Sequence, residues 1–297
     1  MKSKSKKIIT AIVSAISLAA LTLGLTACNK DGTYTALTAQ ADIFTELNAK
    51  TADVGILDFT MANYLLKNDS AMANNLQIAD IDIGAEEYAI ATRKADSGKY
   101  SVLGDKINRA LAALKSTEYT QIAESYGLTD CMLDYTYSEP TGEPDYTEWN
   151  KVKNAGKIVI GFTFNAPMAI GIGTQPNATN GGFDTDLSKA VFNYINAQEG
   201  TSIAVEFKLI SWVNKESEMN SGSIDCLWNG LTAMPERASM WELSISYLSN
   251  KQAVLIRKSD VDKYRDIESI KSARIVAESG SSGEEVAMDL LGIAKED

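Results

Sequence analysis

The sequence of 297 residues contains no histidine and only three cysteines. The missing histidine excludes Ser-His-Asp and Cys-His catalysis, and it excludes histidine-ligated metal sites. Basic residues are also scarce, because 28 lysines and arginines stand against 39 acidic residues, giving a formal net charge of -11. Nucleic-acid binding needs a basic surface, so this partner is not expected. Carboxylates, lysines and hydroxyls remain as the groups that can act, and nothing indicates a cofactor or a metal.

The scarcity of cysteine also limits the covalent framework. Cys131 and Cys226 are the two cysteines outside the N-terminal segment. An exported chain permits a disulfide between them, but two cysteines are too few for a disulfide scaffold. Cys226 lies in the apolar run "SIDCLWNG", where a free cysteine behaves as a small hydrophobic residue. We therefore do not expect the two to be paired.

Residues 1–28 have the pattern of an export signal. A leader with four lysines precedes the uncharged apolar run "IITAIVSAISLAALTLGL". The run ends in "LTAC", which resembles the lipobox of bacterial lipoproteins, with Cys28 as the residue that would carry the lipid. We expect an exported chain anchored by this lipid to the outer face of the cell membrane, since several acyl chains hold a protein firmly. The alternative is an uncleaved transmembrane anchor.

Apolar runs alternate with helical patterns along the rest of the chain, and 45% of all residues are hydrophobic. This alternation predicts an α/β fold with largely parallel sheets. The chain from Tyr34 reads as helix, turn, strand, helix, and a long helix is expected over 102–128 with Gly127 as its C-cap. Residues 129–150, which include Pro140 and Pro144, are the most linker-like segment. The expected strands are 52–58, 86–94, 157–164, 203–210, 223–230, 250–258 and 272–278.

Four segments together resemble the amino-acid-binding family of extracellular solute-binding proteins, the receptors of bacterial importers. They read "TADVGILDFTMANYLL" (51–66), "GGFDTDLSKAV" (181–191), "GSIDCLWNGLTAMPER" (222–237) and "AESGSSGEEVA" (277–287). With the strands between them they cover nearly all of residues 40–297. The resemblance implies a two-lobed periplasmic-binding-protein-like fold, whose lobes are joined by hinge strands at 86–94 and 251–258.

The order of these segments differs from that of the family, where the "GFD" helix comes first and the "ILD" strand follows the "GSSG" loop. The chain therefore resembles a circularly permuted member. On this interpretation residues 29–94 form lobe 2 and a hinge, 95–254 form a continuous lobe 1, and 255–297 form a hinge and the rest of lobe 2. Such an order is tolerated when the ends are close, so Asp31 and Asp297 are expected to be neighbours. The alternative is a fragment of a longer tandem product.

The resemblance also assigns a binding site. Arg237 holds the family's position for the ligand carboxylate, which a planar guanidinium binds with two parallel hydrogen bonds. Thr232 would add a hydroxyl, and the carbonyl of Gly230 would accept from the ligand ammonium. Asp58 would pair with that ammonium from the end of a strand. The plainer alternatives are an exposed arginine at a helix start and a helix N-cap at Asp58.

Further contacts are implied in both lobes. Ser281 and Ser282 would stand at a helix N-terminus, which binds anions through its free amides. Ser281 also fits an ordinary N-cap, and the two roles are compatible. Phe164 and Trp228, with Phe162 nearby, are candidates for an apolar wall around the ligand side chain, and a place in the core is the alternative for each ring.

The resulting prediction is a lipid-anchored receptor that binds an amino acid between two lobes and delivers it to the membrane permease of an ATP-driven importer. The acidic chain and Asn229 beside Trp228 favour a polar ligand side chain. One alternative is an enzyme on the same scaffold, resembling dehydratases of cyclic acids, with Glu278 as general acid or base. Another is a receptor or partial receptor that no longer binds a ligand.

Overall fold

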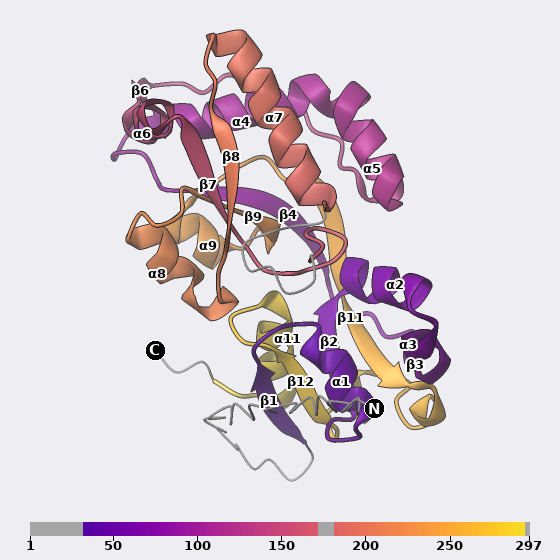
Figure 1. The fold of residues 1–297 in the computed structure, drawn as a ribbon. Coiled ribbons are helices and arrows are strands. Elements are labelled where there is room, and N and C mark those ends of the chain that lie inside the picture. The colour runs from indigo at the N-terminus through magenta and orange to yellow at the C-terminus, as the bar shows by residue number, and fades with distance from the viewer. Residues whose placement is uncertain (1–31, 172–180, 295–297) are drawn as a thin grey trace, which may run out of the picture.

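A computed structural model describes residues 32–171 and 181–294. The export signal, Cys28, Asp31 and Asp297 lie outside these residues. Within them the chain forms two lobes, drawn one above the other in Figure 1, and each lobe has a central sheet with helices packed against it. No helix in the described part of the chain is both long and apolar enough to span a bilayer.

The lower lobe is built from the two ends of the described chain. In its sheet, β12 pairs in parallel with β1 on one side and with β2 on the other, and β11 follows as an antiparallel neighbour of β2. Two apolar clusters, one on each face of this sheet, form its core. The elements are β1 (Thr33–Leu37), α1 (Asp42–Asn48), β2 (Val54–Asp58), α2 (Phe59–Asn68), α3 (Ser70–Asn75), β3 (Leu76–Ile78), α10 (Ile267–Ile270), β12 (Arg274–Glu278) and α11 (Ser282–Leu291).

The upper lobe is formed by the middle of the chain around the strand order β4-β9-β7-β8. Its largest apolar cluster brings together side chains of α4, α5, α7, β7 and β9. The elements are β4 (Ala85–Thr92), β5 (Lys99–Ser101), α4 (Val102–Leu114), a π-helical turn (Lys115–Tyr119), α5 (Thr120–Tyr126), β6 (Glu143–Asp145), α6 (Thr147–Ala155), β7 (Lys157–Phe162), α7 (Phe183–Glu199), β8 (Ala204–Leu209), α8 (Lys215–Asn220), β9 (Cys226–Thr232), α9 (Pro235–Met240) and β10 (Glu242–Leu243).

Strand β11 (Leu248–Arg257) belongs to both lobes (Figure 1). Its first part, Leu248–Lys251, pairs with β4 of the upper lobe, and its second part, Gln252–Ile256, pairs with β2 of the lower lobe. The chain also crosses between lobes at residues 79–84, between β3 and β4. The pairing thus places the crossings before β4 and near residue 251, whereas the sequence suggested 94 and 254. The expected α/β class with two lobes and a hinge is confirmed.

The described ends of the chain lie near each other in the lower lobe. A Cβ atom added at Gly32 would lie 3.1 Å from Cδ2 of Leu291. Strand β1 packs against α11 as well as pairing with β12. This proximity is what a permuted order requires, and the permutation itself stays a prediction.

Two local predictions were wrong. Thr33–Leu37 is strand β1 and not part of a helix, because its alternating Thr and Tyr residues suit the open edge of β12. The single helix expected over 102–128 is broken at Thr117, whose φ of -128° and ψ of -112° are not helical. Its end was placed correctly, since Gly127 adopts the left-handed conformation with φ of 68° and caps α5.

The linker-like segment is held more firmly than its composition suggested. Trp149, near its end, is only 3% exposed and packs into the main cluster of the upper lobe. The phenol of Tyr135 donates a hydrogen bond of 3.0 Å to the carbonyl of Leu111. Only the stretch around residues 138–144 is largely exposed. The segment therefore has two anchored ends and an exposed centre, and β6 (Glu143–Asp145) at the end of that centre pairs with β5.

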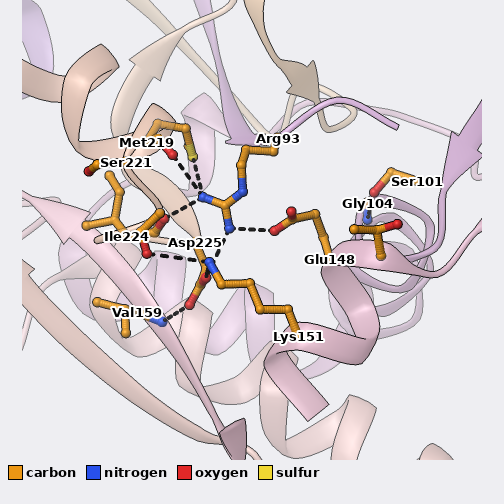
Figure 2. A network of polar contacts seen from close by, with 12 residues as sticks. Arg93, Ser101, Gly104, Glu148, Lys151, Val159, Met219, Ser221, Ile224 and Asp225 are labelled. Carbon is orange, nitrogen blue, oxygen red and sulfur yellow. Dashed lines mark hydrogen bonds and ion pairs between the residues drawn. The ribbon is translucent and has the colours of Figure 1, made fainter. Parts of the chain in front are cut away.

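A polar network fastens α6 to the sheet next to it (Figure 2). Arg93, just after β4, contacts Glu148 of α6 and Asp225 at the start of β9, the latter at 3.1 Å. Lys151 of α6 reaches the same Asp225 at 2.8 Å. The carbonyl of Ile224 accepts another hydrogen bond from Arg93, so the N–H donors of this half-buried guanidinium have partners in the protein. This cluster is structural, because no polar group in it is left for a ligand.

The two cysteines within the described residues are free. Cys226 is buried in β9, and burial raises the pKa of its thiol well above the usual value. Cys131 is half-buried beside Met132, at the edge of the upper lobe. The absence of a disulfide agrees with the expectation from their number and setting.

Candidate functional site

A narrow pocket lies where the two lobes meet, at the C-terminal ends of their strands. Ligands of open α/β sheets bind at this end, because the loops that follow the strands converge there. The lower lobe contributes the ends of β2 and β12 and the loop after β1, and the upper lobe contributes β9 and the loops after β7 and β8. The lining residues are Gln40, Asp58, Thr163, Asn165, Trp212, Asn229, Gly230, Thr232, Arg237, Glu278, Ser281 and Ser282.

Six of the eight ligand-binding residues predicted from the sequence line this one pocket. They come from distant parts of the chain and from both lobes: Asp58, Gly230, Thr232, Arg237, Ser281 and Ser282. Their convergence depends on the fold alone, since they come from three separate stretches of the sequence.

The other two, Phe164 and Trp228, do not line the pocket. Trp228 is 1% exposed and packs against Tyr247 in the core, with the ring centroids 6.3 Å apart. Successive side chains of a strand point to opposite faces, so its neighbour Asn229 faces the pocket instead. Phe164 is half-buried against Phe162, at 5.5 Å between ring centroids. The ring that does line the pocket is Trp212, in the loop after β8.

Arg237 is a buried cation without an acidic partner. Its side chain is 5% exposed, so it is not the surface arginine that the sequence alone allowed. Nη1 donates to the carbonyl of Thr232 at 2.9 Å, and Nη2 lies 3.5 Å from the carbonyl of Gly280 in the other lobe. No carboxylate of the described residues lies within 4 Å of it. Burial lowers the pKa of Arg237, and the charges of Glu285, Glu86, Asp58 and Glu216 oppose this effect only in part.

Asp58 is the matching anion in the lower lobe, and it too lacks an oppositely charged partner. It is 3% exposed and stands at the N-cap position of α2, but its side chain makes no capping hydrogen bond there. Its oxygens accept from neutral amides: Gln40 at 2.7 Å, Gln252 at 2.8 Å, Asn250 at 3.3 Å and Asn165 at 3.4 Å. The amides orient the carboxylate but leave its charge unneutralised.

Hydrogen bonds cross directly from one lobe to the other around these charges. The hydroxyls of Thr232 and Ser282 lie 3.1 Å apart, and the ammonium of Lys215 donates to the carbonyl of Gly280 at 3.0 Å. Ser281 is the N-cap of α11, where its Oγ accepts from the amide of Glu284 at 3.1 Å. The lobes are thus in contact, and the arrangement is a closed one.

Asp184, the acidic residue of the "GFD" segment, holds the backbone of Gly230 in place. Asp184 accepts from the amide of Gly230 at 2.7 Å and from the phenol of Tyr247 at 2.8 Å. Gly230 has a φ of +62°, a conformation that glycine adopts without strain. Burial raises the pKa of Asp184 to about 7. The signature residue is therefore a support for the β9 backbone and not a ligand contact.

One more carboxyl group lines the pocket, and another lies behind its lining residues. Glu278, at the end of β12, is 4% exposed, and burial together with the nearby charge of Asp58 raises its pKa to about 8. Glu86 of β4 accepts from the hydroxyl of Thr232 at 3.0 Å and from Gln252 at 3.0 Å. Burial and the same Asp58 charge raise the pKa of Glu86 to about 7.

Sequence reasoning missed Glu86 and several residues that line the pocket from loops. Gln40, Asn165 and Trp212 follow the ends of β1, β7 and β8, and their position after a strand was the one available signal. Across residues 32–171 and 181–294, no group of three or more His, Cys, Asp or Glu side chains is arranged to hold a metal ion. The described lining of the pocket offers the cation Arg237 and the acids Asp58 and Glu278, which suits a small zwitterion.

Comparison with known proteins shows which family part of the chain is similar to. Residues 159–282 match the family described as bacterial extracellular solute-binding proteins, family 3. The glutamine-binding protein of Geobacillus stearothermophilus is 24% identical over 133 residues, which are 44% of this chain and 48% of that protein. The chain therefore spans about half the length of this curated relative.

Two solved structures match shorter segments. A substrate-binding protein of an ABC uptake transporter from Streptococcus pneumoniae, solved with bound histidine, is 36% identical over 31% of this chain and 35% of its own, with a TM-score of 0.26. A protein from Streptococcus thermophilus, described as binding the substrate of a polar amino acid ABC uptake transporter, is 32% identical over 32% of this chain and 34% of its own, with a TM-score of 0.27. The family and these relatives are substrate-binding proteins and not enzymes. Residues 159–282 are thus similar to the extracellular solute-binding proteins of family 3, and these relatives of the chain are amino-acid-binding proteins of the same kind.

Proposed function

We propose that the chain is an exported receptor that closes its two lobes around an amino acid and presents it to the permease of an importer. The observation that carries this proposal is the pair formed by Arg237 and Asp58. The two are buried, oppositely charged and in different lobes, and neither forms a salt bridge within 4 Å among the described residues. Burying an unpaired charge is costly, so a ligand that carries both charges would stabilise the closed form.

In this proposal the ligand carboxylate lies against Arg237, whose guanidinium has donors beyond the two contacts it makes to backbone carbonyls. The amides at the start of α11, next to Ser282, are further donors for it, whereas the hydroxyl of Thr232 already donates to Glu86. The ammonium lies against Asp58 and the carbonyl of Gly230. The names of the glutamine-binding relative and of the polar amino acid transporter protein agree with a ligand of this class.

Delivery and anchoring are parts of the same proposal. Closure of a binding protein gives a permease a signal that ligand is present, because the closed form becomes the populated one. Cys28, outside the described residues, would hold the chain at the membrane through its lipid. A receptor without binding activity remains the competing function, and it predicts that no amino acid stabilises the protein.

The test is a thermal-shift panel of the common amino acids, followed by calorimetry on the best one. A ligand at 100 times its Kd adds about 2.7 kcal/mol of stability, which is readily measured. Arg237→Ala should keep the fold and lose about 30-fold to several-thousand-fold in affinity, because one partner of a buried charge pair is removed.

Asp58→Asn supplies the matched control. It should weaken binding of the amino acid far more than binding of the corresponding acid without the ammonium group. If Arg237→Ala binds as tightly as the parent protein, the proposed role of this site is wrong.

A further inference from the structure

The pocket holds more acidic groups than the two ends of an amino acid can use. In the proposed function Arg237 takes the carboxylate and Asp58 takes the ammonium. Glu278 then remains, 4% exposed and lining the same pocket. It makes no salt bridge within 4 Å to any cation of the described residues. With a pKa of about 8 Glu278 is mainly protonated at pH 7, and a positive group from outside the chain would stabilise its ionised form.

Glu86 does not compete for this role, because protein groups already hold it. Its oxygens accept from Thr232, Asn250 and Gln252, and it does not line the pocket itself. We therefore treat Glu86 as part of the frame that orients Asp58 and Thr232. The acid with capacity left for a ligand is Glu278.

A second observation points to a donor on the ligand. The side-chain oxygen of Asn165 is buried and has no hydrogen-bond partner, although the residue lines the pocket and is 5% exposed. Its nitrogen is directed to Asp58 at 3.4 Å, which fixes the oxygen as the free end. A buried acceptor without a donor costs about 1–3 kcal/mol, so an N–H from a ligand would relieve it.

The aromatic residue of the pocket agrees with the same chemistry. Trp212 is 5% exposed and lines the pocket, and tryptophan is the best ring for binding a cation on its face. The ammonium of Lys215 already lies 5.3 Å from the centroid of this ring. Trp212, Glu278 and Asn165 thus present a ring, an anion and an acceptor to one small space.

We infer that the bound amino acid carries a positively charged side chain, of the arginine or lysine kind, held by Glu278, Asn165 and Trp212. This inference rests on the proposed function and narrows it, because a neutral polar side chain would bring no positive charge to Glu278, which has a hydrogen bond with Gln40 but no salt bridge within 4 Å among the described residues. A negatively charged side chain would lie beside Asp58 and Glu278 and is disfavoured.

The experiment is calorimetry with pairs of ligands of the same shape and different charge. Arginine should bind about tenfold or more tighter than citrulline, and lysine tighter than norleucine by a similar factor. Glu278→Gln should reduce the affinity for arginine by about tenfold or more while changing that for citrulline little. Glu87→Gln, at an exposed position of β4, is the control and should change neither.

Proton release provides a second readout on the same samples. Burial and Asp58 raise the pKa of Glu278 to about 8, Asp42 acts in the same direction, and the hydrogen bond with Gln40 and the charge of Lys215 oppose them. A cation bound beside Glu278 lowers that pKa, so binding of arginine at pH 7 should release protons, measurable in buffers of different ionisation enthalpy. Glu278→Gln should abolish most of this release.

The outcomes distinguish a failure of the cationic preference from a failure of the proposed receptor function. If citrulline or glutamate binds as well as arginine, the cationic preference is wrong and the amino-acid receptor stands. If no amino acid binds, the proposed function fails together with its refinement. Melting curves of Glu278→Gln and the parent protein establish that the variant is folded before either conclusion is drawn.

Discussion

Asp184 shows how one residue can determine a site that it does not touch. Its carboxyl group lies at the first turn of α7, fully buried, with the amide of Gly230 and the phenol of Tyr247 as donors. These bonds fix the left-handed turn in β9 that brings the carbonyl of Gly230 toward the cleft. The residue is thus a positioning residue, and the site depends on its hydrogen bonds more than on its charge.

Replacing Asp184 by Asn should therefore change the pH dependence of stability. The folded-state pKa of about 7 lies above the ordinary value of 3.8, so the folded protein keeps this proton to higher pH than the unfolded chain does. The free energy of unfolding should fall between pH 4 and pH 7 through this group, by on the order of 3 kcal/mol, and the Asn variant should lack this contribution.

Thermal melting of both proteins across pH 4 to 8 measures the difference. Glu86 and Glu278 titrate in both proteins, so their contributions cancel in the comparison. Asn can still accept from Gly230 and donate to Tyr247, and ligand affinity should change by less than about tenfold. Parallel pH profiles of the two proteins would show that Asp184 is not the titrating group.

At the scale of elements, the segment from residue 129 to 150 makes a specific prediction. Its ends are anchored by Tyr135 and Trp149, and its centre around 138–144 is exposed. Proteolytic cleavage in the centre should leave a folded protein that still binds its ligand. Trp149→Ala should instead destabilise the fold by about 3–5 kcal/mol, because a buried ring leaves a cavity. Melting temperatures of the nicked protein and of the variant test both statements, and a small loss for Trp149→Ala contradicts the anchoring role.

Elements with strong periodicity were predictable from the sequence, and those set by tertiary partners were not. The apolar run of β2 and the glycine that ends α5 determine local structure on their own. Strand β1 is short, and only the open edge of β12 makes it a strand. The break at Thr117 likewise lies within a sequence of ordinary helix formers.

The same distinction holds for the site. Arg237 and Asp58 were identified because they lie in motifs that resemble a family. Trp228 was chosen over Asn229 because the sequence does not reveal which face of β9 turns to the cleft. Trp212 and Gln40 come from loops whose course depends on the packing of both lobes, so no local pattern could have found them.

At the scale of the whole molecule, the contact between Lys215 and the carbonyl of Gly280 joins the lobes at the mouth of the cleft. Burial and the neighbouring Arg237 lower the pKa of Lys215 to about 8, and this reports the crowding of positive charge in the closed form. Lys215→Met should favour the open form and weaken ligand binding by about tenfold, because less of the protein is competent to bind. Small-angle scattering at subsaturating ligand should then show a smaller contraction of the variant than of the parent protein. An unchanged ligand affinity of the variant would mean that this contact does not stabilise the closed form.

Strand β11 determines how the two lobes can move relative to each other. Its two parts are paired to different lobes, and each part keeps its own ladder of hydrogen bonds. The lobes can therefore rotate by changes in a few backbone torsions near Lys251 and Gln252, without breaking either ladder. Such a joint is soft to bending but stiff to sliding and stretching. Motion is then confined to opening and shutting the cleft, so Arg237 and Asp58 return to the same facing positions each time the lobes close.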